Sequence, residues 1–230
     1  MKWFTALLLP LAATSAHASP TEINAEYRVT NNGLVVGRVI ETYVRTGNAY
    51  AISSRTTSEG LLKVFLDETV TLTSEGSVGA GGLRPDTFEQ RQARRRGRDV
   101  RATFDWKGGV MHSESNGESK EHELPAGTQD RISVMYQFMN IAPRGDTIDM
   151  HMSNGRKVER YTYRKTEEVP LSTPAGDFDT LHYERVTTDP GQSRAQVWLA
   201  KDKFNFPVRI VFDDPKGLRL DQTLVSLQAR

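Results

Sequence analysis

A cluster of arginines in the second quarter of the chain is the densest concentration of one chemical group in the sequence. Its members are Arg91, Arg94, Arg95, Arg96, Arg98 and Arg101. Guanidinium groups bind phosphate oxygens through paired hydrogen bonds, and lipopolysaccharide and anionic lipid headgroups carry such oxygens. The candidate anion-binding residues are therefore Arg94, Arg95, Arg96 and Arg98. The alternative is a solvated hairpin loop that carboxylates elsewhere balance. No aromatic residue is interleaved to stack on bases, so no nucleic-acid partner is expected.

The other chemically reactive residues do not form a recognisable metal or catalytic motif. Beyond His17, the histidines are isolated in the sequence, at His112, His122, His151 and His182. No His-x-x-x-His or His-x-His pair occurs, and the chain has no cysteine, so no metal site, disulfide or cysteine nucleophile is predicted. Gly-x-Ser-x-Gly, Ser-x-x-Lys and P-loop motifs are missing as well. We assign no catalytic residue and no cofactor, and the balance leans towards a protein without enzymatic activity.

Asp130 and Arg131 are the one adjacent pair of charges that invites a catalytic interpretation, as a carboxylate beside an anion clamp. The simpler interpretation is that Asp130 lies in the first turn of a helix, where the helix dipole favours an anion. Thr128 is then expected to be the N-cap. The sequence favours this capping role for the pair.

That helix, expected over residues 128–141, is the one convincing helix in the sequence. Ile132, Met135, Tyr136 and Met139 follow at i, i+3, i+4 and i+7 and make one apolar stripe. Methionine adapts to irregular ligands, so the helix is a candidate wall of a pocket for an acyl chain. The candidate ligand-binding residues are Met135, Tyr136, Phe138, Met139 and Trp198. The alternative is that the helix residues are ordinary core between helix and sheet.

Elsewhere the chain alternates apolar and polar residues with period two, which is typical of strands with one buried face. Asn154-Gly155 predicts a tight hairpin between residues 147–152 and 158–165. Residues 196–200 and 208–212 are the clearest strands. The pattern predicts a mainly β protein, a strongly curved antiparallel sheet or open β-barrel, with the helix covering its concave side or mouth.

The first 18 residues have the three parts of a secretory signal peptide. Lys2 is basic, a short apolar run contains Leu7 to Leu9, and Ala16-His17-Ala18 offers small residues for cleavage. The apolar run is too short for a bilayer core of ~30 Å, so no transmembrane segment is expected. Cleavage leaves 29 basic and 29 acidic residues, a balance that argues against broad attraction to nucleic acid or anionic lipid. We expect residues 19–230 to form a single β-rich periplasmic domain.

Several stretches of the chain carry a family resemblance. They are residues 27–37, 127–133, 173–178, 197–202 and 206–210, with QDRIS at 129–133 and the Trp-Leu-Ala strand as the more specific parts. Together they resemble an uncharacterised bacterial family of exported proteins, a domain of unknown function. The resemblance covers most of the mature chain and implies no reaction or ligand. The expected architecture is more weakly similar to that of periplasmic lipoprotein carriers, which form half-closed antiparallel barrels with a helical cover.

These observations favour a non-enzymatic periplasmic protein that binds a hydrophobic or amphipathic ligand of the cell envelope, a lipid or lipoprotein-like molecule, in a half-open barrel. Two alternatives remain open. One is an envelope hydrolase that uses scattered carboxylates such as Asp105, or Asp130 near Arg131. The other is a scaffold whose exposed strand edge recruits a protein partner by β-augmentation.

Overall fold

Fifteen strands join into one large curved sheet in the computed structural model, which describes residues 19–60, 68–94, 96–140 and 145–230. The expected signal segment, residues 1–18, lies outside the described residues. The strands are β1 (Glu22–Asn31), β2 (Leu34–Thr46), β3 (Ala49–Ser58), β4 (Thr69–Gly79), β5 (Gly82–Gln92), β6 (Val100–Asp105), β7 (Val110–Ser115), β8 (Glu118–Glu123), β9 (Gln129–Asp130), β10 (Thr147–Ser153), β11 (Val158–Thr173), β12 (Gly176–Arg185), β13 (Arg194–Ala200), β14 (Phe206–Asp213) and β15 (Arg219–Ala229).

The strand order shows two meanders, β1 to β8 and β9 to β15, which are joined by the pairing of β1 with β15. From β1 the sheet runs through β2 to β8 in one direction, and through β15, β14 and onward to β9 in the other. The first and last strands are therefore neighbours in the middle of the sheet, with Ile23 opposite Ala229. Among the pairings of the described strands, β9 with β10 is parallel and the rest are antiparallel.

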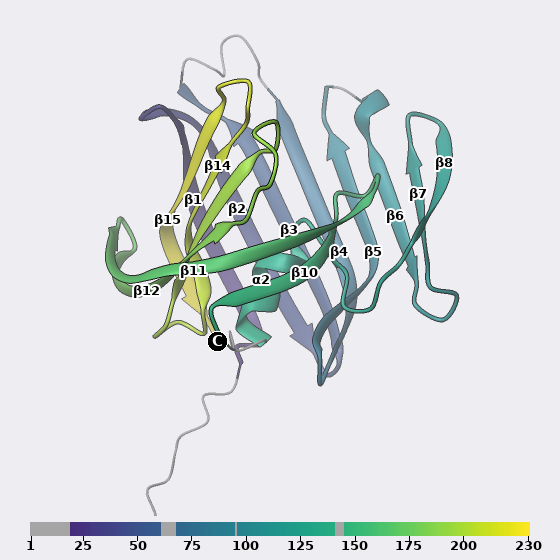
Figure 1. The fold of residues 1–230 in the computed structure, drawn as a ribbon, viewed down its shortest axis with the longest axis horizontal. Coiled ribbons are helices and arrows are strands. Elements are labelled where there is room, and N and C mark those ends of the chain that lie inside the picture. The colour runs from purple at the N-terminus through teal and green to yellow at the C-terminus, as the bar shows by residue number, and fades with distance from the viewer. Residues whose placement is uncertain (1–18, 61–67, 95, 141–144) are drawn as a thin grey trace, which may run out of the picture.

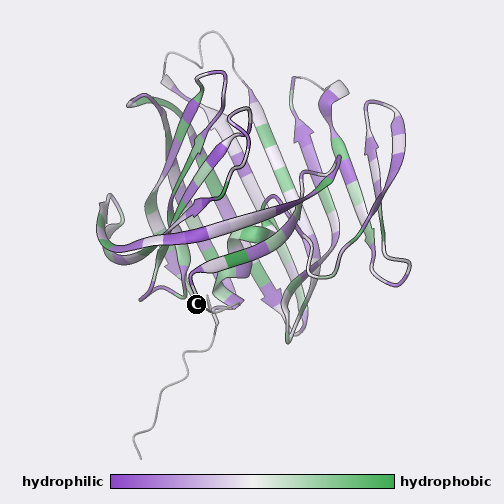
Figure 2. Ribbon diagram, in the orientation of Figure 1, coloured by the Kyte–Doolittle hydropathy of each residue, from purple (hydrophilic) through white to green (hydrophobic). Residues whose placement is uncertain are grey.

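Alternation of residue type creates the buried face of this sheet. In β1 the side chains of Ile23, Ala25, Tyr27 and Val29 are buried, while the residues between them are half-buried or exposed. Successive side chains of a strand point to opposite faces, and Figure 2 shows apolar and polar bands alternating along many strands. The expected mainly β fold with a strongly curved sheet is confirmed, and the two edges, β8 and β9, do not pair with each other.

The helix α2 (Ser133–Asn140) lies inside the bend of the sheet, with β10 and β11 passing in front of it in Figure 1. Among the described strands it contacts β5, β9 and β14. The prediction of one helix packed on the concave side is confirmed within the described residues. Figure 1 also places the two meanders on either side of the helix, so that both of its faces meet sheet.

The start of the helix differs from the prediction, because Asp130 and not Thr128 is the N-cap. The Asp130 carboxylate accepts hydrogen bonds from the backbone N–H groups of Ile132 and Ser133, and the Ser133 hydroxyl accepts one from the N–H of Asp130. Thr128 donates its hydroxyl to the carbonyl of Pro125. The helix begins later than expected because Gln129 and Asp130 pair with β10 as β9. Its expected last residue, Ile141, lies outside the described residues.

Candidate functional site

A hollow of about 300 Å³ opens between α2 and β10, and is called the α2–β10 hollow below. Its apolar wall consists of Phe138 from the helix with Ile148 and Met150 from the strand, which belong to one packed cluster. The residues that line it are Gly81, Ala126, Gly127, Gln129, Gln137, Phe138, Ile148, Asp149, Met150, His151 and Arg160. This size lies at the small end of ordinary ligand pockets.

The hollow exists because β9 is much shorter than its neighbour. Met152 and Ser153 of β10 pair with β9, whereas residues 147–151 pair with β11 alone. Along those residues β10 therefore has a strand partner on one side alone, as far as the described residues show. Four residues of this stretch line the hollow, namely Ile148, Asp149, Met150 and His151. The site combines apolar and charged side chains along one strand.

Two glutamines hold the inner wall of the hollow against the turn between β4 and β5. Gln137 accepts a hydrogen bond from the N–H of Leu83 through Oε1 (2.7 Å) and donates Nε2 to the carbonyl of Gly81 (2.9 Å). Gln129 donates Nε2 to the carbonyls of Leu83 (2.8 Å) and Gly127 (3.3 Å). We call this set of bonds the glutamine latch. It ties α2 and β9 to the opposite meander.

Gln129 is the polar residue of the hollow that the protein leaves incompletely bonded. Its side chain is 1% exposed, and its Oε1 has no hydrogen-bond partner among the described residues. Both contacts of its amide nitrogen are carbonyl oxygens, which cannot donate, so the orientation of the amide follows from chemistry. A buried acceptor without a partner is unusual in a folded protein. The oxygen is itself fully enclosed by the protein and is therefore not presented to the hollow.

The outer rim of the hollow is charged. Arg160 lies 3.2 Å from Asp149, which also accepts a hydrogen bond of 2.5 Å from the hydroxyl of Thr162. The bond from Thr162, with Arg160 nearby, lowers the pKa of Asp149. The rim is thus ionised near neutral pH, and its exposed charges are already paired with each other.

Two buried carboxylates, Glu41 and Asp130, lie in the core and not in an open cleft. Glu41 accepts hydrogen bonds from Ser54 (3.0 Å) and Tyr136 (3.2 Å), and burial raises its pKa despite them. Burial raises the pKa of Asp130 to about 6, while the hydrogen bonds of its capping role and of Ser74 act in the opposite direction. Glycoside hydrolysis needs paired carboxyl groups that flank a bound sugar, and these enclosed side chains do not provide that arrangement.

Asp105, the other carboxylate considered for catalysis, is the last residue of β6 and precedes a turn. Its Oδ1 accepts hydrogen bonds from the backbone N–H groups of Lys107 (3.0 Å) and Gly108 (2.9 Å). This is the standard role of aspartate in a tight turn. The geometry around Asp105 is accounted for by the turn alone.

The five predicted ligand-binding residues do not converge on one place. Phe138 lines the α2–β10 hollow, and Met139 lines a separate open hollow of about 530 Å³ beside the β13–β14 turn. Tyr136 is fully buried, stacks on Tyr43 at 5.1 Å and packs edge-on against Phe206. Met135 packs partly buried between the two core clusters.

Trp198 lies on the face of β13 opposite the hollow. Its neighbours Val197 and Leu199 pack in the same cluster as Phe138, so Trp198, between them in the strand, points the other way. Its indole ring stacks on the His182 ring at 4.1 Å, and the guanidinium of Arg209 lies 4.8 Å from its ring centre.

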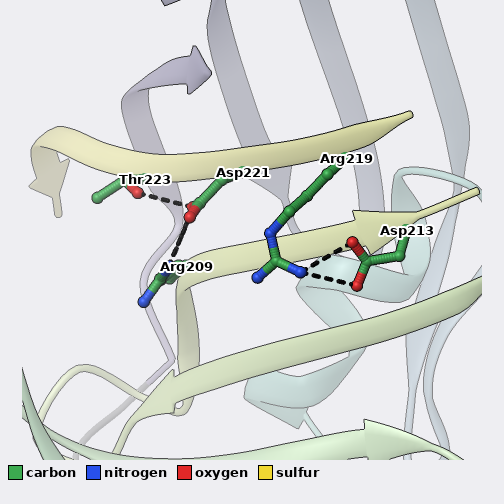
Figure 3. A network of polar contacts seen from close by, with 5 residues as sticks. All are labelled: Arg209, Asp213, Arg219, Asp221 and Thr223. Carbon is green, nitrogen blue, oxygen red and sulfur yellow. Dashed lines mark hydrogen bonds and ion pairs between the residues drawn. The ribbon is translucent and has the colours of Figure 1, made fainter. Parts of the chain in front are cut away.

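The residues around Arg209 form the polar network of Figure 3. Arg209 binds both carboxylate oxygens of Asp221 (3.0 and 2.5 Å), and Thr223 donates its hydroxyl to the same carboxylate. Arg219 donates from the single nitrogen Nη1 to both carboxylate oxygens of Asp213 on the neighbouring part of these strands (2.8 and 3.0 Å). Every member is bonded to another, so this network stabilises the pairing of β14 with β15.

The candidate anion-binding arginines lie around the short 3-10 helix η1 (Arg96–Arg98), between β5 and β6. Arg95 lies outside the described residues. The N–H of Arg94 donates to a carboxylate oxygen of Glu68, and the carbonyl of Arg98 accepts from the guanidinium of Arg156. In the flanking strands Arg91 and Arg101 both contact Glu89. Anion binding by this cluster stays a prediction.

The sequence did not single out Gln129, Ile148 or Met150, which the structure brings to the hollow with Phe138. One signal was present, since Ile148 and Met150 alternate along a predicted strand. Gln129 belongs to the QDRIS stretch, yet its type gave no indication of burial, since glutamine is mostly exposed. The described residues contain no group of three potential metal ligands from histidine, aspartate and glutamate, and no described helix is long and apolar enough to span a membrane.

The fold and hollow define a class of protein, a β-barrel-like domain with an unclosed sheet and an internal helix. The chain belongs to the family of proteins of unknown function called DUF3108, whose model matches residues 26–223. The predicted membership of a family of unknown function is confirmed. The sequence matches no curated protein.

One solved structure confirms the fold. A crystal structure of a β-barrel-like protein with the domain of unknown function DUF1849, from Brucella abortus, is similar with a TM-score of 0.65 at 12% identity, covering 92% of this chain and 99% of that one. A protein from Bacteroides fragilis described as exported, with a YmcC-like fold, gives a TM-score of 0.35 at 10% identity, with 91% and 96% covered. An outer-membrane lipoprotein-sorting domain from Vibrio parahaemolyticus gives 0.27 at 10% identity, with 91% and 85% covered. The last two scores are too low to support an argument.

Proposed function

We propose that the protein is a non-enzymatic binding protein of the cell envelope, which holds a hydrophobic or amphipathic ligand in the α2–β10 hollow. The observation that carries the proposal is the composition of this hollow. Phe138, Ile148 and Met150 supply an apolar wall, and Asp149 and Arg160 supply a charged rim. Apolar walls with a few fixed polar groups are typical of small-molecule sites.

A location in the periplasm is part of the same proposal and rests on residues 1–18. Their basic start, short apolar run and Ala16-His17-Ala18 are typical of a cleaved signal peptide. N-terminal sequencing of the protein purified from the envelope fraction of producing bacteria tests this directly. We expect the mature chain to begin at Ser19, and recovery of an intact Met1 from cytosolic fractions would contradict the assignment.

The binding function is tested by filling the hollow. Ile148 is partly buried on its wall, so Ile148→Trp places a larger apolar side chain in the space. Protein with the natural sequence, purified without detergent, is titrated with the fluorescent apolar probe N-phenylnaphthylamine. We expect saturable binding that Ile148→Trp weakens at least roughly tenfold, the equivalent of about 1.4 kcal/mol.

Ile40→Trp is the matched control, because Ile40 is 47% exposed on β2 and does not line the hollow. The control variant is expected to bind the probe as the natural protein does. Equal binding by all three proteins, or no saturable binding by any, would rule out the hollow as the ligand site.

The two alternative functions gain less from the described residues. At edge strand β8, recruitment of a partner strand is disfavoured because the strand carries Glu118, Lys120, Glu121 and Glu123. Charges of this kind protect edges against pairing. A hydrolase would need an open pair of acidic groups, and Asp130 is enclosed in its capping role.

A further inference from the structure

We propose that one end of the sheet, at the β1–β2 and β14–β15 turns, is a contact surface for a lipid bilayer and inserts shallowly into its headgroup region. The surface consists of Leu34 and Val35 at the start of β2, Phe212 near the end of β14 and Leu218 just before β15, and is called the apolar end below. Both turns lie at the end of the sheet away from the C-terminus (Figure 1).

Exposed apolar side chains are concentrated at this end. Six large apolar residues of the described chain are more than a third exposed, and four of them form the apolar end, with exposed fractions that run from 37% for Phe212 to 69% for Leu34. Single apolar residues scattered over a surface are ordinary, whereas a group of them indicates a contact surface.

The strand register joins the two turns into one surface. Leu34 lies opposite Asn31 of β1, which lies opposite Leu220 of β15. Leu220 in turn lies opposite Phe212 of β14. Directly opposite residues point to the same face of a sheet, so these side chains form one row across four strands, about 14 Å long.

Apolar side chains occupy both faces of the sheet at the β1–β2 turn. Leu34 belongs to the row, whereas Val35 follows it in the strand and lies opposite Thr30, on the other face. A ligand inside the fold, or a protein bound to one face, would contact only one of the two. A lipid surface surrounds the end of a hairpin and contacts both, so the two-sided arrangement favours a bilayer.

The size of the apolar end disfavours a second copy of the chain as its partner. Four side chains at these exposed fractions present an apolar area on the order of 300 Å², in the range of the largest patch on an ordinary monomer. A stable interface between two proteins buries roughly 800 Å² on each partner. Lipid adapts to the shape of whatever inserts, so a small patch contributes its full apolar area.

The charges at the β14–β15 turn are compatible with anionic headgroups. Lys216 is exposed two residues before Leu218, and its side chain has no ion-pair partner among the described residues. The carboxylates of the turn are engaged, Asp213 by Arg219 (2.8 Å) and Asp214 by the backbone N–H of Lys216 (2.7 Å). A lysine beside apolar side chains extends its ammonium group to the phosphates while its stem stays among them.

Flotation with vesicles tests the proposal. Protein purified from the envelope fraction is mixed with vesicles of phosphatidylethanolamine and a minority of phosphatidylglycerol, and the bound fraction gives a partition coefficient. Leu34→Ser combined with Leu218→Ser should lower this coefficient at least roughly tenfold, because two of the four apolar side chains are lost. No binding by the natural protein would overturn the proposal.

Ile40→Ser combined with Val44→Ser is the matched control. These residues are 47% and 46% exposed on β2, but lie about 20 and 33 Å along the strand from Leu34. The control should partition within about twofold of the natural protein, since scattered apolar residues do not form a contact surface. Equal losses in the two double variants would contradict a contact confined to the apolar end.

Insertion is measured separately with an added tryptophan, in Leu218→Trp and in Val44→Trp. Lipids brominated in their acyl chains quench an indole that reaches them, and the emission of the natural protein is subtracted. Tryptophan at position 218 should be quenched and tryptophan at position 44 should not. Equal quenching at the two positions would overturn shallow insertion by the apolar end.

Sedimentation without lipid distinguishes the bilayer from a second copy of the chain. A dimer of the natural protein that the Leu34→Ser and Leu218→Ser double variant no longer forms would assign the apolar end to self-association and overturn the proposal. None of the four residues of the apolar end lines the α2–β10 hollow, so N-phenylnaphthylamine should bind the double variant as it binds the natural protein. The membrane contact and the proposed binding function can therefore fail separately.

Discussion

Asp130 connects three parts of the molecule through one buried carboxylate. It caps α2 through the N–H groups of Ile132 and Ser133, and it accepts a hydrogen bond from Ser74 of β4. Ser74 in turn lies 3.0 Å from the hydroxyl of Tyr50 on β3. These three donors do not fully replace the water that a carboxylate loses on burial, and the pKa of Asp130 therefore rises to about 6.

This pKa predicts that stability falls as pH rises through about 6. A carboxyl group whose pKa is higher in the folded than in the unfolded protein binds its proton more tightly when folded, so acid favours folding through this group. Between about pH 5 and about pH 7, Asp130 should lower the free energy of unfolding by roughly 1 kcal/mol. Asp130→Asn, which retains a good N-cap, should flatten the dependence by that amount in urea unfolding at the two pH values. An unchanged slope in the variant would contradict the assignment.

The buried carboxylate of Glu41 is also stabilised by a hydrogen bond, which the hydroxyl of Tyr136 donates. The hydroxyl of Tyr136 donates to a carboxylate that is 7% exposed and has Ser54 as its other side-chain donor. Tyr136→Phe should lower the free energy of unfolding by about 1–3 kcal/mol, the usual cost of a buried group left without its partner. Urea unfolding checks the value.

Tyr43→Phe is the control, because Tyr43 stacks on Tyr136 but no side-chain hydrogen bond of its hydroxyl is seen among the described residues. Its effect should stay within about 0.5 kcal/mol. A Tyr136→Phe variant as stable as this control would show that Glu41 does not need the phenol.

At the scale of elements, the helix shows which structural features the local sequence pattern predicts and which it does not. The apolar stripe of Ile132, Met135, Tyr136 and Met139 predicted a helix, and α2 is there. The predicted start of the helix was wrong because Gln129 and Asp130 pair with β10. This is a long-range contact that local capping rules do not take into account. The stripe could not predict that Phe138 lines the hollow, since a helix between two layers of sheet has two buried faces.

Pro170 shows how tertiary context decides whether a strand tolerates a proline. Pro170 lies within β11, which continues without a break to Thr173. β10 pairs with β11 as far as Arg164, so beyond that point one side of β11 has no partner strand among the described residues. Proline is tolerated on such an edge because the missing N–H is not needed there.

The glutamine latch makes a prediction about Gly82, at the start of β5. Its φ of +88° favours glycine, and a Cβ atom would lie 2.3 Å from Oε1 of Gln137. Gly82→Ala should therefore lower the free energy of unfolding by about 1–3 kcal/mol. Thermal and urea unfolding measure the change.

The neighbouring Gly81 is the control for this variant. A Cβ atom there would have no atom within 4 Å, so Gly81→Ala should change stability by less than about 0.5 kcal/mol. Similar losses for the two variants would indicate that the turn as a whole, and not the contact with Gln137, is sensitive.

At the scale of the whole molecule, the sequence predicted the class of fold but not its assembly. Alternation and turn residues predict which consecutive strands pair, and these pairings account for most of the sheet. They carry no information about β1 and β15, which are adjacent in the structure although they lie at opposite ends of the domain. Residue type alone also cannot reveal that Trp198 lies on the face of β13 opposite the one that packs against Phe138.

The central position of β1 and β15 predicts that the domain cannot fold until its last strand is available. β1 bonds to β2 on one side and to β15 on the other, and Leu224 of β15 is fully buried in the core. Truncation after Gly217 removes β15, exposes an edge in the middle of the sheet and should leave the chain without cooperative unfolding. Far-ultraviolet circular dichroism and size-exclusion chromatography measure this outcome.

A circular permutant separates the need for β15 from the order in which the strands are made. The N–H of Thr21 lies 2.6 Å from the carbonyl of Arg230, so a short linker can join residues 19 and 230. New ends can open at the two-residue turn of Asn116 and Gly117, between β7 and β8. In this permutant β15 and β1 form a local hairpin, which lowers the sequence separation of the central contact and should speed folding several-fold. Stability should stay within about 1 kcal/mol of that of the natural chain. A permutant that folds no faster, beside a truncated chain that still unfolds cooperatively, would show that the centre of the sheet does not control folding.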